Sequence, residues 1–255
     1  MNLSLVIRCA TDPRLRYCLR SIDERIETVV VMNDPTHEIQ MIAKNHGAKC
    51  VNVEAACDVA DMQNIGVTTT SSDQVLLMDS DCIFMPGCIS KIYAELERSR
   101  ECIIRGNVHF KSQGGLSDII ARLRLWHDMD RAYTPLLAFN KDTVLSRMGG
   151  YFFDVNCSFV EDHEFDLRRR NAGVPLVYCE NAVAEHDVTY FREDIRRARK
   201  YGRGFKGIGD TVGLKRMLID TTRKASSIMH ECGAPAALYY LTVWKPTFLV
   251  SYYGR

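Results

Sequence analysis

The chain has 255 residues, of which 46% are apolar and 25% charged, and its 33 basic side chains are nearly balanced by 32 acidic ones. This is the composition of an ordinary globular protein, and it excludes a disordered chain, a collagen and a small disulfide-stabilised fold. The net charge of +1 argues against a strongly basic nucleic-acid-binding protein, so we expect no nucleic-acid partner.

Ten cysteines are present, but no two are spaced as C-x-x-C, so the patterns of zinc ribbons and thioredoxin-like motifs are absent. Free thiols in a chain of this size favour a reducing compartment. The N-terminal residues lack the basic start and long apolar segment of a signal peptide. No uninterrupted apolar stretch reaches the roughly 18 residues that a membrane span needs. We therefore expect a cytoplasmic protein.

The first hundred residues alternate between short apolar segments and amphipathic ones. The pattern predicts strands at 3–8, 28–32, 48–53 and 74–78, and helices at 14–22, 38–45, 59–69 and 86–98. Strands that alternate with helices at this spacing form right-handed βαβ units and a parallel sheet. The fourth strand is apolar throughout at 75–78, as expected of a sheet covered on both faces.

The second half is less regular. It predicts strands at 102–110, 136–139, 176–178 and 182–184, helices at 116–130 and 158–172, and a loop at 149–153. Ser158 and Glu161 form an S-x-x-E capping box for the second helix, and Gly173 followed by Pro175 marks its end. From residue 190 the chain is helical and basic, then apolar and aromatic, with a proline at 246 that should break or kink any helix.

Two acidic residues, Asp79 and Asp81, directly follow the apolar fourth strand. Ligands of open α/β sheets bind beyond the carboxyl ends of the strands. Two carboxylates placed there can hold a hard divalent cation, which usually completes its shell with substrate phosphates. The alternative is a turn or helix cap, but the next predicted helix begins near Pro86, too far for Asp81 to cap it. We therefore favour a metal site.

Acidic residues also open the helix predicted at 158–172. The helix dipole accounts for acids in a first turn, the capping box for Glu161, and an i,i+4 pair for Asp166 with Arg170. Asp162 takes part in neither the capping box nor the i,i+4 pair. A carboxylate at this place, ionised at neutral pH, can take a proton from an acceptor hydroxyl.

His186 ends the last predicted strand. A lone histidine is usually a structural residue, but neutral imidazole is also a normal ligand of Mn²⁺-class ions beside carboxylates. The segment 192–206 then carries seven basic residues against two acidic ones. It is either a solvated helix face or, since glycines interrupt it, a loop that closes over a diphosphate or contacts an anionic membrane.

Taken in order, these pieces resemble the family 2 glycosyltransferases, which have a GT-A fold. The matching segments, from about residue 3 to 210, are Asn33-Asp34 after the second strand, Asn64-Ile65-Gly66 in a helix, Asp79-Ser80-Asp81, the loop Gly149-Gly150-Tyr151-Phe152, Glu161-Asp162 to Leu167-Arg168 with Gly173, His186, and Tyr201-Gly202-Arg203-Gly204. The chain departs from the family pattern at 8–11, Asn33 and Gln63, where the nucleotide would be read, so the base stays open.

The resemblance implies an α/β fold with a mostly parallel sheet flanked by helices. It implies a GT-A domain at 1–190 and a helical extension at 191–255 packed on it. The implied activity is an inverting, metal-dependent transfer of a hexosyl or hexosaminyl group from a nucleotide-diphosphate sugar to an acceptor hydroxyl. A UDP-sugar is the favoured donor, a GDP-sugar is the alternative, and the acceptor is open.

Residue roles follow from the same resemblance. Asp162 would be the catalytic base, and Mn²⁺ or Mg²⁺ would be held by Asp79, Asp81 and His186, with Asp79 also near the ribose. The donor would otherwise be contacted by Asn33, Asp34, Asn64, Arg199 and Arg203.

Other functions compete with this interpretation. A sugar nucleotidyltransferase shares the architecture but needs a glycine-rich basic loop after its first strand, and residues 8–16 contain no glycine. A phosphatase of the haloacid dehalogenase type carries D-x-D on its first strand, whereas three strands precede it here. A degenerate module that only binds a partner would not need the acids. The C-terminal tail either packs on the domain or rests on the inner face of a membrane.

Overall fold

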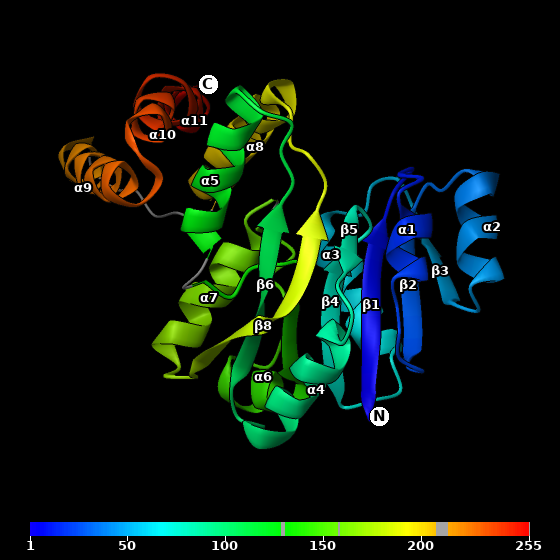
Figure 1. The fold of residues 1–255 in the computed structure, drawn as a ribbon. Helices are drawn as coiled ribbons and strands as arrows, with labels where there is room; N and C mark the ends of the chain where they lie inside the picture. The colour runs from blue at the N-terminus through cyan, green and yellow to red at the C-terminus, as the bar shows by residue number, and fades with distance from the viewer. Residues whose placement is uncertain (129–130, 158, 208–213, 255) are drawn as a thin grey trace. The chain divides into compact units, whose positions relative to one another are not determined.

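The computed structural model describes residues 1–128, 131–157, 159–207 and 214–254 (Figure 1). The chain divides into two compact units. The first comprises Met1–His109, Asp130–Val155 and Glu161–His186, and the second comprises Phe110–Met129, Asn156–Val160 and Asp187–Arg255. The residues around 116–128 thus group with the C-terminal helices, and the domain boundary expected at 190 stays a prediction.

The described residues form one eight-stranded sheet in the order β3-β2-β1-β4-β7-β6-β8-β5 (Figure 1). Its strands are β1 Leu3–Cys9, β2 Glu27–Asn33, β3 Lys49–Val53, β4 Gln74–Asp79, β5 Cys82–Phe84, β6 Ile103–Phe110, β7 Leu137–Asn140 and β8 Leu176–His186. The pairs β1–β2, β1–β4 and β2–β3 are parallel, whereas β4–β7, β6–β7 and β5–β8 are antiparallel. The predicted α/β class with a mostly parallel sheet flanked by helices is confirmed.

The helices of the first unit connect these strands. They are α1 Leu15–Arg20, α2 His37–Asn45, α3 Val59–Thr69, α4 Cys88–Arg98, α6 Lys141–Arg147 and α7 Glu161–Asn171. The chain proceeds outward from β1 through β2 to β3 and then returns to place β4 on the other side of β1. Such a reversal of strand order opens a crevice at the carboxyl ends of the two central strands, where ligands bind in this class of fold.

Four elements of this unit differ from the prediction. The strands expected at 176–178 and 182–184 are one strand, β8, whose exposed residues Glu180 and Asn181 interrupt the apolar pattern without interrupting the pairing. The short elements β5 and α6 were not predicted. The helix expected at Pro86 begins at Cys88, after Gly87 in a left-handed conformation with φ of 71°.

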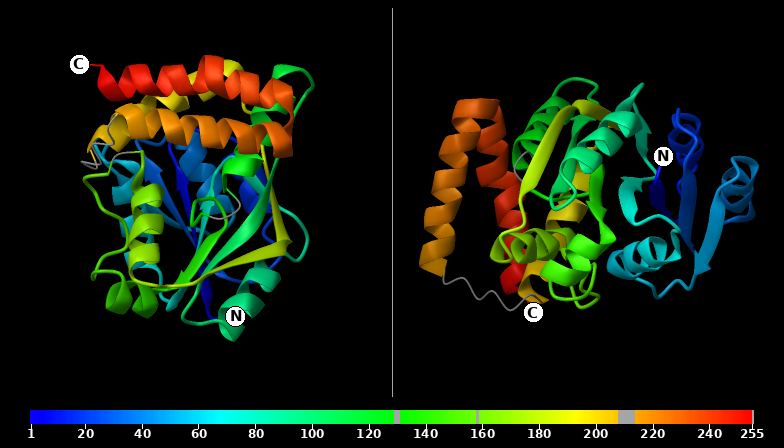
Figure 2. Two further views of the ribbon diagram at one scale, coloured as in Figure 1. Left: turned by 90° about the vertical axis from the view of Figure 1, so that its left-hand side faces the viewer. Right: turned by 90° about the horizontal axis from the view of Figure 1, so that it is seen from below.

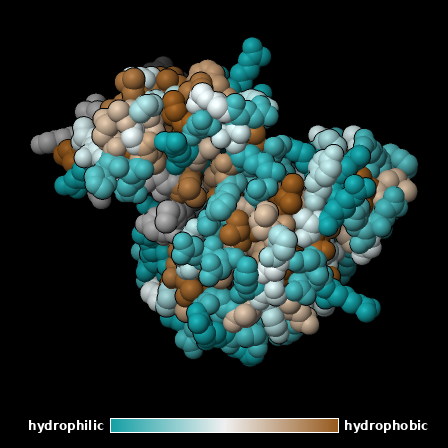
Figure 3. All heavy atoms as spheres, in the orientation of Figure 1, coloured by the Kyte–Doolittle hydropathy of each residue, from teal (hydrophilic) through white to brown (hydrophobic). Residues whose placement is uncertain are grey.

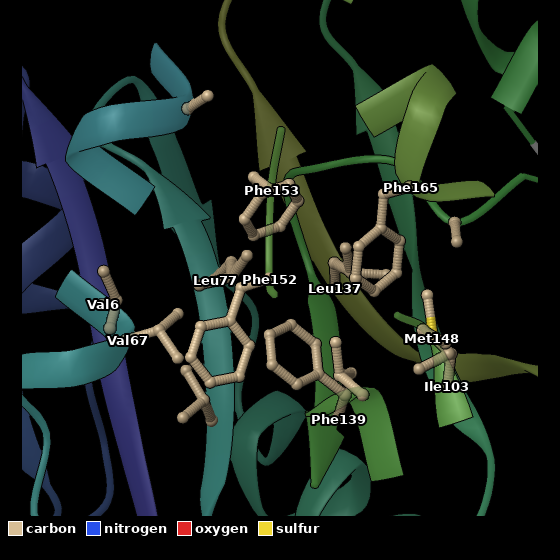
Figure 4. Close-up of a cluster of buried hydrophobic side chains, with 14 of the residues drawn as sticks. Val6, Val67, Leu77, Ile103, Leu137, Phe139, Met148, Phe152, Phe153 and Phe165 are labelled. Atoms are coloured by element: carbon tan, nitrogen blue, oxygen red, sulfur yellow. The ribbon is translucent and has the colours of Figure 1, made fainter. Parts of the chain in front are cut away.

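The core of the first unit lies between the sheet and the helices α3 and α7 (Figure 4). Four phenylalanine rings contact one another there in the order Phe153, Phe165, Phe139 and Phe152. Their ring centroids lie 5.1 Å apart for Phe153 and Phe165, 5.7 Å for Phe165 and Phe139, and 6.1 Å for Phe139 and Phe152. Stacked and tilted rings at these separations add to the stabilisation from burial alone. The predicted loop is therefore anchored in the core through Phe152 and Phe153.

The second unit is helical. Its elements are α5 Leu116–Asp128, α8 Phe191–Gly207, α9 Leu214–Cys232, α10 Ala234–Tyr239, the π-helical turn η1 Tyr240–Trp244 and α11 Lys245–Tyr253. The last three form one uninterrupted helical rod (Figure 2). Pro246 was expected to break a helix here. It lies in the first turn of α11, where its missing N–H costs little, directly after the wider π turn.

The basic segment at 192–206 is also helical. Of the two alternatives for this segment, a helix face and a glycine-interrupted loop, the structure has the helix, because α8 continues to Gly207. Gly202 has a packing role instead: a Cβ atom there would lie 2.4 Å from the carbonyl oxygen of Phe248 on α11. The glycine thus lets the two helices approach closely. No helix in the described part of the chain is long and apolar enough to cross a lipid bilayer.

Candidate active site

Arg8 and Asp79 face each other across the two central strands. The parallel register pairs Arg8 on β1 with Asp79 on β4, so both side chains leave the sheet on the same face. Arg8 Nε donates a hydrogen bond to Asp79 Oδ1 at 2.9 Å. Burial would lower the pKa of Arg8, but the charges of Asp79, Glu161 and Asp81 raise it, so the guanidinium stays charged. The Arg8–Asp79 ion pair therefore lies at the switch point of the sheet, the place between β1 and β4 where the strand order reverses.

Asp81 lies in the tight turn between β4 and β5, beside the end of β8. The antiparallel register of β5 and β8 places Cys82 opposite His186. His186 Nε2 lies 3.5 Å from Asp81 Oδ2, and the Cys82 thiol donates to Asp81 Oδ1 at 3.7 Å. The ligand atoms of Asp81, Cys82 and His186 all lie within 4.8 Å of one another. The structure thus brings together two of the three predicted metal ligands and adds a thiol.

Two arginines share the acidic groups at this edge. Asp79, the third predicted ligand, is bound by Arg8. Arg14 Nη2 lies 3.7 Å from Asp81 Oδ2, but it makes a shorter contact of 2.6 Å with Asp12 Oδ2. Arginines beside carboxylates at a sheet edge can also bind the oxygens of a diphosphate, which match the planar guanidinium donors.

Three of the predicted nucleotide contacts lie in the first unit, at the end of β2 and on α3. Asn33 ends β2, and its Nδ2 donates to the carbonyl of Cys57 at 2.8 Å. Asp34 is exposed and has a positive φ of 45°. Asn64 on α3 binds the backbone of Phe153 twice: Nδ2 donates to its carbonyl at 2.8 Å, and Oδ1 accepts from its N–H at 2.9 Å. Asn64 therefore fixes the loop at 149–153, and its contact with the donor stays a prediction.

The two acids at the start of α7 differ in environment. Asp162 lies half-buried in the first helical turn. Glu161 is buried, and its Oε2 makes no hydrogen bond to any residue that the structure describes. Ser158, its expected capping partner, lies outside the described residues. Burial raises the pKa of Glu161 to about 6, assisted by the charges of Asp58 and Asp79 and opposed by that of Arg8. The ionisation of Glu161 thus depends on the charges of both Arg8 and Asp79.

Arg168 organises the glycine-containing loop at 149–153. Its guanidinium donates to the carbonyls of Met148, Tyr151 and Phe152, and Nε donates to Glu164 Oε1 at 2.8 Å. Its guanidinium carbon lies 3.9 Å from the ring centroid of Tyr151. Three carbonyls bound by one cation define a loop conformation more strongly than any of the contacts alone.

Asp166 fixes the segment that precedes β7. The predicted pair is present, with Arg170 Nε donating to Asp166 Oδ2 at 2.8 Å. Arg169 and the backbone N–H of Ala132 donate to Oδ1 at 2.8 Å and 3.1 Å. Burial opposes ionisation of Asp166, but these donors hold its pKa below the usual value. Asp166 therefore has a structural role.

Arg199 and Arg203, predicted to contact the diphosphate, are exposed on α8 in the second unit. The neighbouring Lys200 lies over the ring of Phe159, with Nζ 4.1 Å from the ring centroid. The diphosphate contacts of Arg199 and Arg203 stay predictions.

Sequence reasoning missed three residues of this site: Arg8, Cys82 and Glu161. The D-x-D motif was recognised, but the thiol that directly follows its second acid was not considered as a ligand. The pairing of Arg8 with Asp79 depends on strand order, which no local pattern carries. Glu161 was assigned to a cap because the S-x-x-E pattern is a complete local explanation.

Comparisons with known proteins identify the family and the fold. The family model described as glycosyl transferase family 2 matches residues 7–159. A comparison with curated proteins found no match. The fold is similar to three crystal structures of S. aureus TarS, and this likeness confirms the predicted GT-A fold.

The three TarS structures are similar to this chain in fold rather than in sequence. The first has a TM-score of 0.58 at 13% identity and covers 95% of this chain, which spans only 46% of that TarS chain. TarS 1-349 has a TM-score of 0.59 at 14% identity, and TarS 1-349 in complex with UDP-GlcNAc has 0.61 at 13%. Each of these two covers 98% of this chain and is itself covered to 79%.

Proposed function

Since the chain belongs to glycosyl transferase family 2, we propose that it transfers a hexosyl or hexosaminyl group from a nucleotide-diphosphate sugar to an acceptor hydroxyl, with inversion at the anomeric carbon. The observation that carries the proposal is the juxtaposition of Arg8, Asp79, Asp81 and His186 at the switch point of the sheet. A pair of carboxylates between arginines and an imidazole suits a ligand that brings both a diphosphate and a divalent cation.

The favoured donor is a UDP-sugar, with a GDP-sugar as the alternative. One structure that this fold resembles is a complex with UDP-GlcNAc, which supports the choice for this chain. The nucleobase of the donor would lie beyond β2, beside Asn33 and the exposed Asp34. Asp79 would accept a hydrogen bond from a ribose hydroxyl while its Oδ1 accepts one from Arg8.

A divalent cation, Mn²⁺ or Mg²⁺, fits the donor set around Asp81. The oxygen and nitrogen of Asp81 and His186 are 3.5 Å apart, a separation that two ligands of one ion can adopt. When bound, such a cation neutralises charge on the departing diphosphate. Asp79 is held by Arg8 and would act on the ribose rather than as a direct ligand.

Asp162 would be the base. The acceptor oxygen forms a bond to the anomeric carbon on the side opposite the diphosphate, and the bond to the diphosphate oxygen breaks. The hydroxyl proton passes to the Asp162 carboxylate, which must be ionised and within hydrogen-bond reach of the acceptor. Glu161 is less suited, because it is buried and its charge is already opposed by Asp79.

The protein would work in the cytoplasm, on the inner face of a membrane. Ten free cysteines support a reducing compartment. Hydrophobic side chains gather on the surface of the second unit, at the upper left of Figure 3. On the C-terminal rod, Leu238, Leu241 and Val250 are exposed, and apolar residues on a helix surface can enter the headgroup region of a bilayer. Flotation with anionic vesicles tests this contact.

A thermal-shift panel tests the donor. UDP-, GDP-, CDP- and dTDP-sugars would each be added to the full chain with Mn²⁺, with Mg²⁺ or with EDTA. A ligand that binds the folded state raises the melting temperature by mass action, so a UDP-sugar with a divalent cation should give the largest shift. A shift that survives EDTA contradicts the metal role. Binding without turnover of any acceptor would instead favour a module that only binds.

A further inference from the structure

Five cations lie in one exposed line along α8. They follow the i, i+4, i+7, i+11 and i+14 spacing that places side chains on one face of a helix, and they are Arg192, Arg196, Arg199, Arg203 and Lys206. We propose that this cationic stripe binds the anionic headgroups of a phospholipid bilayer. The inference rests on the membrane location proposed above and deepens it, because it names the surface that makes the contact and the lipid charge that the contact requires.

The charges of the cationic stripe are not neutralised by acidic neighbours. Its four arginines form no hydrogen bond or ion pair with any residue that the structure describes. The two acids of α8 are engaged elsewhere: Glu193 accepts from the backbone N–H of Tyr190 at 3.2 Å, and the buried Asp194 accepts from Arg124 and Tyr239 at 2.7 Å and 2.8 Å. A line of cations on a chain whose net charge is only +1 attracts a negatively charged partner.

The apolar side of α8 is covered by the C-terminal rod. The contacts that join the two, in order along both, are Asp194 with Tyr239, Gly202 with Phe248, and Lys206 with Gly254. The rod and α8 therefore run parallel, side by side, and the exposed side of α8 is the one that carries the cations. A helix held in this way cannot turn its apolar side into a bilayer, so its contact with lipid is an electrostatic one with the headgroups.

The length of the cationic stripe distinguishes between anionic partners. Arg192 and Lys206 are separated by about 21 Å, given the 1.5 Å rise per residue of an α-helix. A single diphosphate is far shorter and could contact only neighbouring cations. The headgroup layer of a bilayer is flat and continuous, so it can contact the whole line at once. A basic cluster of this size on a helix is typical of proteins that bind anionic lipids.

The residues around the cationic stripe favour a bilayer over a nucleic acid. Tyr190 and Phe191 are exposed beside its first arginine, and aromatic side chains next to cations are typical of the membrane interface. Leu238 and Val250 are exposed on the adjacent rod. α8 contains no Asn, Gln, Ser or Thr that could read base edges, and none of its described aromatic residues after Phe191 is fully exposed for base stacking.

Vesicle flotation with the full chain measures the contact. The vesicles are made of phosphatidylcholine alone or of an equimolar mixture with phosphatidylglycerol. Each basic residue near an anionic surface raises the partition coefficient about fivefold, so Arg192→Gln with Arg196→Gln should lower binding to the mixed vesicles about 25-fold. The wild type should bind pure phosphatidylcholine far more weakly, and added NaCl should weaken its binding to the mixed vesicles, because salt screens exposed charges.

Arg20→Gln with Arg25→Gln is the matched control. Both arginines are exposed in the first unit, so this variant loses the same two charges away from α8 and should bind the mixed vesicles like the wild type. Glutamine and arginine have similar helix propensities, so α8 should stay folded, which thermal unfolding checks. If the double variant does not fold, each single variant should lose about fivefold. Arg192→Lys with Arg196→Lys keeps the charge and should retain binding.

The outcomes separate this inference from the proposed transferase. Equal binding to both kinds of vesicle, or an equal loss in the control and the α8 variant, overturns the lipid contact. A wild type that binds soluble polyphosphate but neither kind of vesicle also overturns it. Arg192 and Arg196 are not predicted donor contacts, so the thermal shift with UDP-GlcNAc and Mn²⁺ should survive in the α8 variant. Lipid binding through the stripe by a protein that no sugar nucleotide stabilises would support the lipid contact and contradict the transferase.

Discussion

Arg168 lies over the ring of Tyr151, with its guanidinium carbon 3.9 Å from the ring centroid, while its nitrogens donate to the carbonyls of Met148, Tyr151 and Phe152. The hydroxyl of Tyr151 donates to Glu164 Oε1 at 3.1 Å, and the same oxygen accepts from Arg168. One helix side chain thereby fixes a loop that contains two glycines at positive φ, Gly149 and Gly150. A loop of this kind gains its shape from its contacts rather than from its own backbone preference.

We predict that Arg168→Lys loosens this loop. A lysine keeps the charge but cannot reach three carbonyls in the plane of a guanidinium. Partly buried carbonyls left without donors cost roughly 1–3 kcal/mol of unfolding free energy. Urea unfolding should show this loss, and proteolysis should cut 149–153 faster than in the wild type. Arg147→Lys changes an exposed arginine 3.4 Å from Glu101 and should cost less than about 0.5 kcal/mol. Equal losses in the two variants would contradict the role of Arg168.

The contact of α8 with α11 predicts a second effect on stability. In Gly202→Ala, the new Cβ would lie 2.4 Å from the Phe248 carbonyl and 2.9 Å from the Ser251 side chain, so the helices must separate. Overpacking of this kind typically costs about 1–3 kcal/mol. Arg203→Ala, at an exposed neighbouring position, should stay within about 0.5 kcal/mol of the wild type. A neutral Gly202→Ala variant in thermal unfolding would show that the helices do not pack as closely as this.

The parallel half of the sheet was predictable because its signals are local. In β1 and β2 an apolar strand is followed directly by a helix, and β4 is apolar from Val75 to Met78, so each pattern is complete within a short segment. β5 has only three residues, too few for any periodicity. β8 was divided in two because Glu180 and Asn181 look like a turn, and only pairing with its neighbours keeps them extended.

The site residues also divide into those that a local sequence pattern predicts and those that only the fold brings together. Asp79 and Asp81 were recognised because they follow an apolar strand, which is information within the segment itself. The neighbours of Asp81 and Asp79, namely His186 and Arg8, are determined by the β5–β8 and β1–β4 registers. These registers join residues 104 and 71 positions apart in the chain. The burial of Glu161 depends likewise on packing against distant residues. Sequence patterns therefore named the acids, but their partners required the fold.

The buried carboxylate of Glu161 predicts a pH dependence. Its pKa rises from the ordinary 4.5 to about 6 in the folded protein, so the folded state favours the protonated form. Stability from this group is therefore greatest below pH 4.5 and falls as the pH rises through 6, by about 2 kcal/mol in all. Glu161→Gln should be more stable than the wild type above pH 6, and the difference should vanish near pH 4. Urea unfolding across pH 4–8 measures this, and a difference that does not depend on pH would contradict it.

The last prediction assigns the base between two adjacent acids. General base catalysis typically contributes about 10²–10⁴-fold, so Asp162→Asn should lower kcat by roughly that factor and leave donor affinity unchanged. Glu161→Gln keeps the shape of the side chain and removes a charge that Asp79 opposes, so it should retain much more turnover. Both variants place a neutral amide at the start of α7, which makes each the control for the helix terminus of the other. Once a donor and acceptor pair is known, kcat and thermal shift with donor are measured for both. If Glu161→Gln is inactive while Asp162→Asn turns over at nearly the wild-type rate, the base is the buried acid, and the proton must then reach a carboxylate beside Arg8.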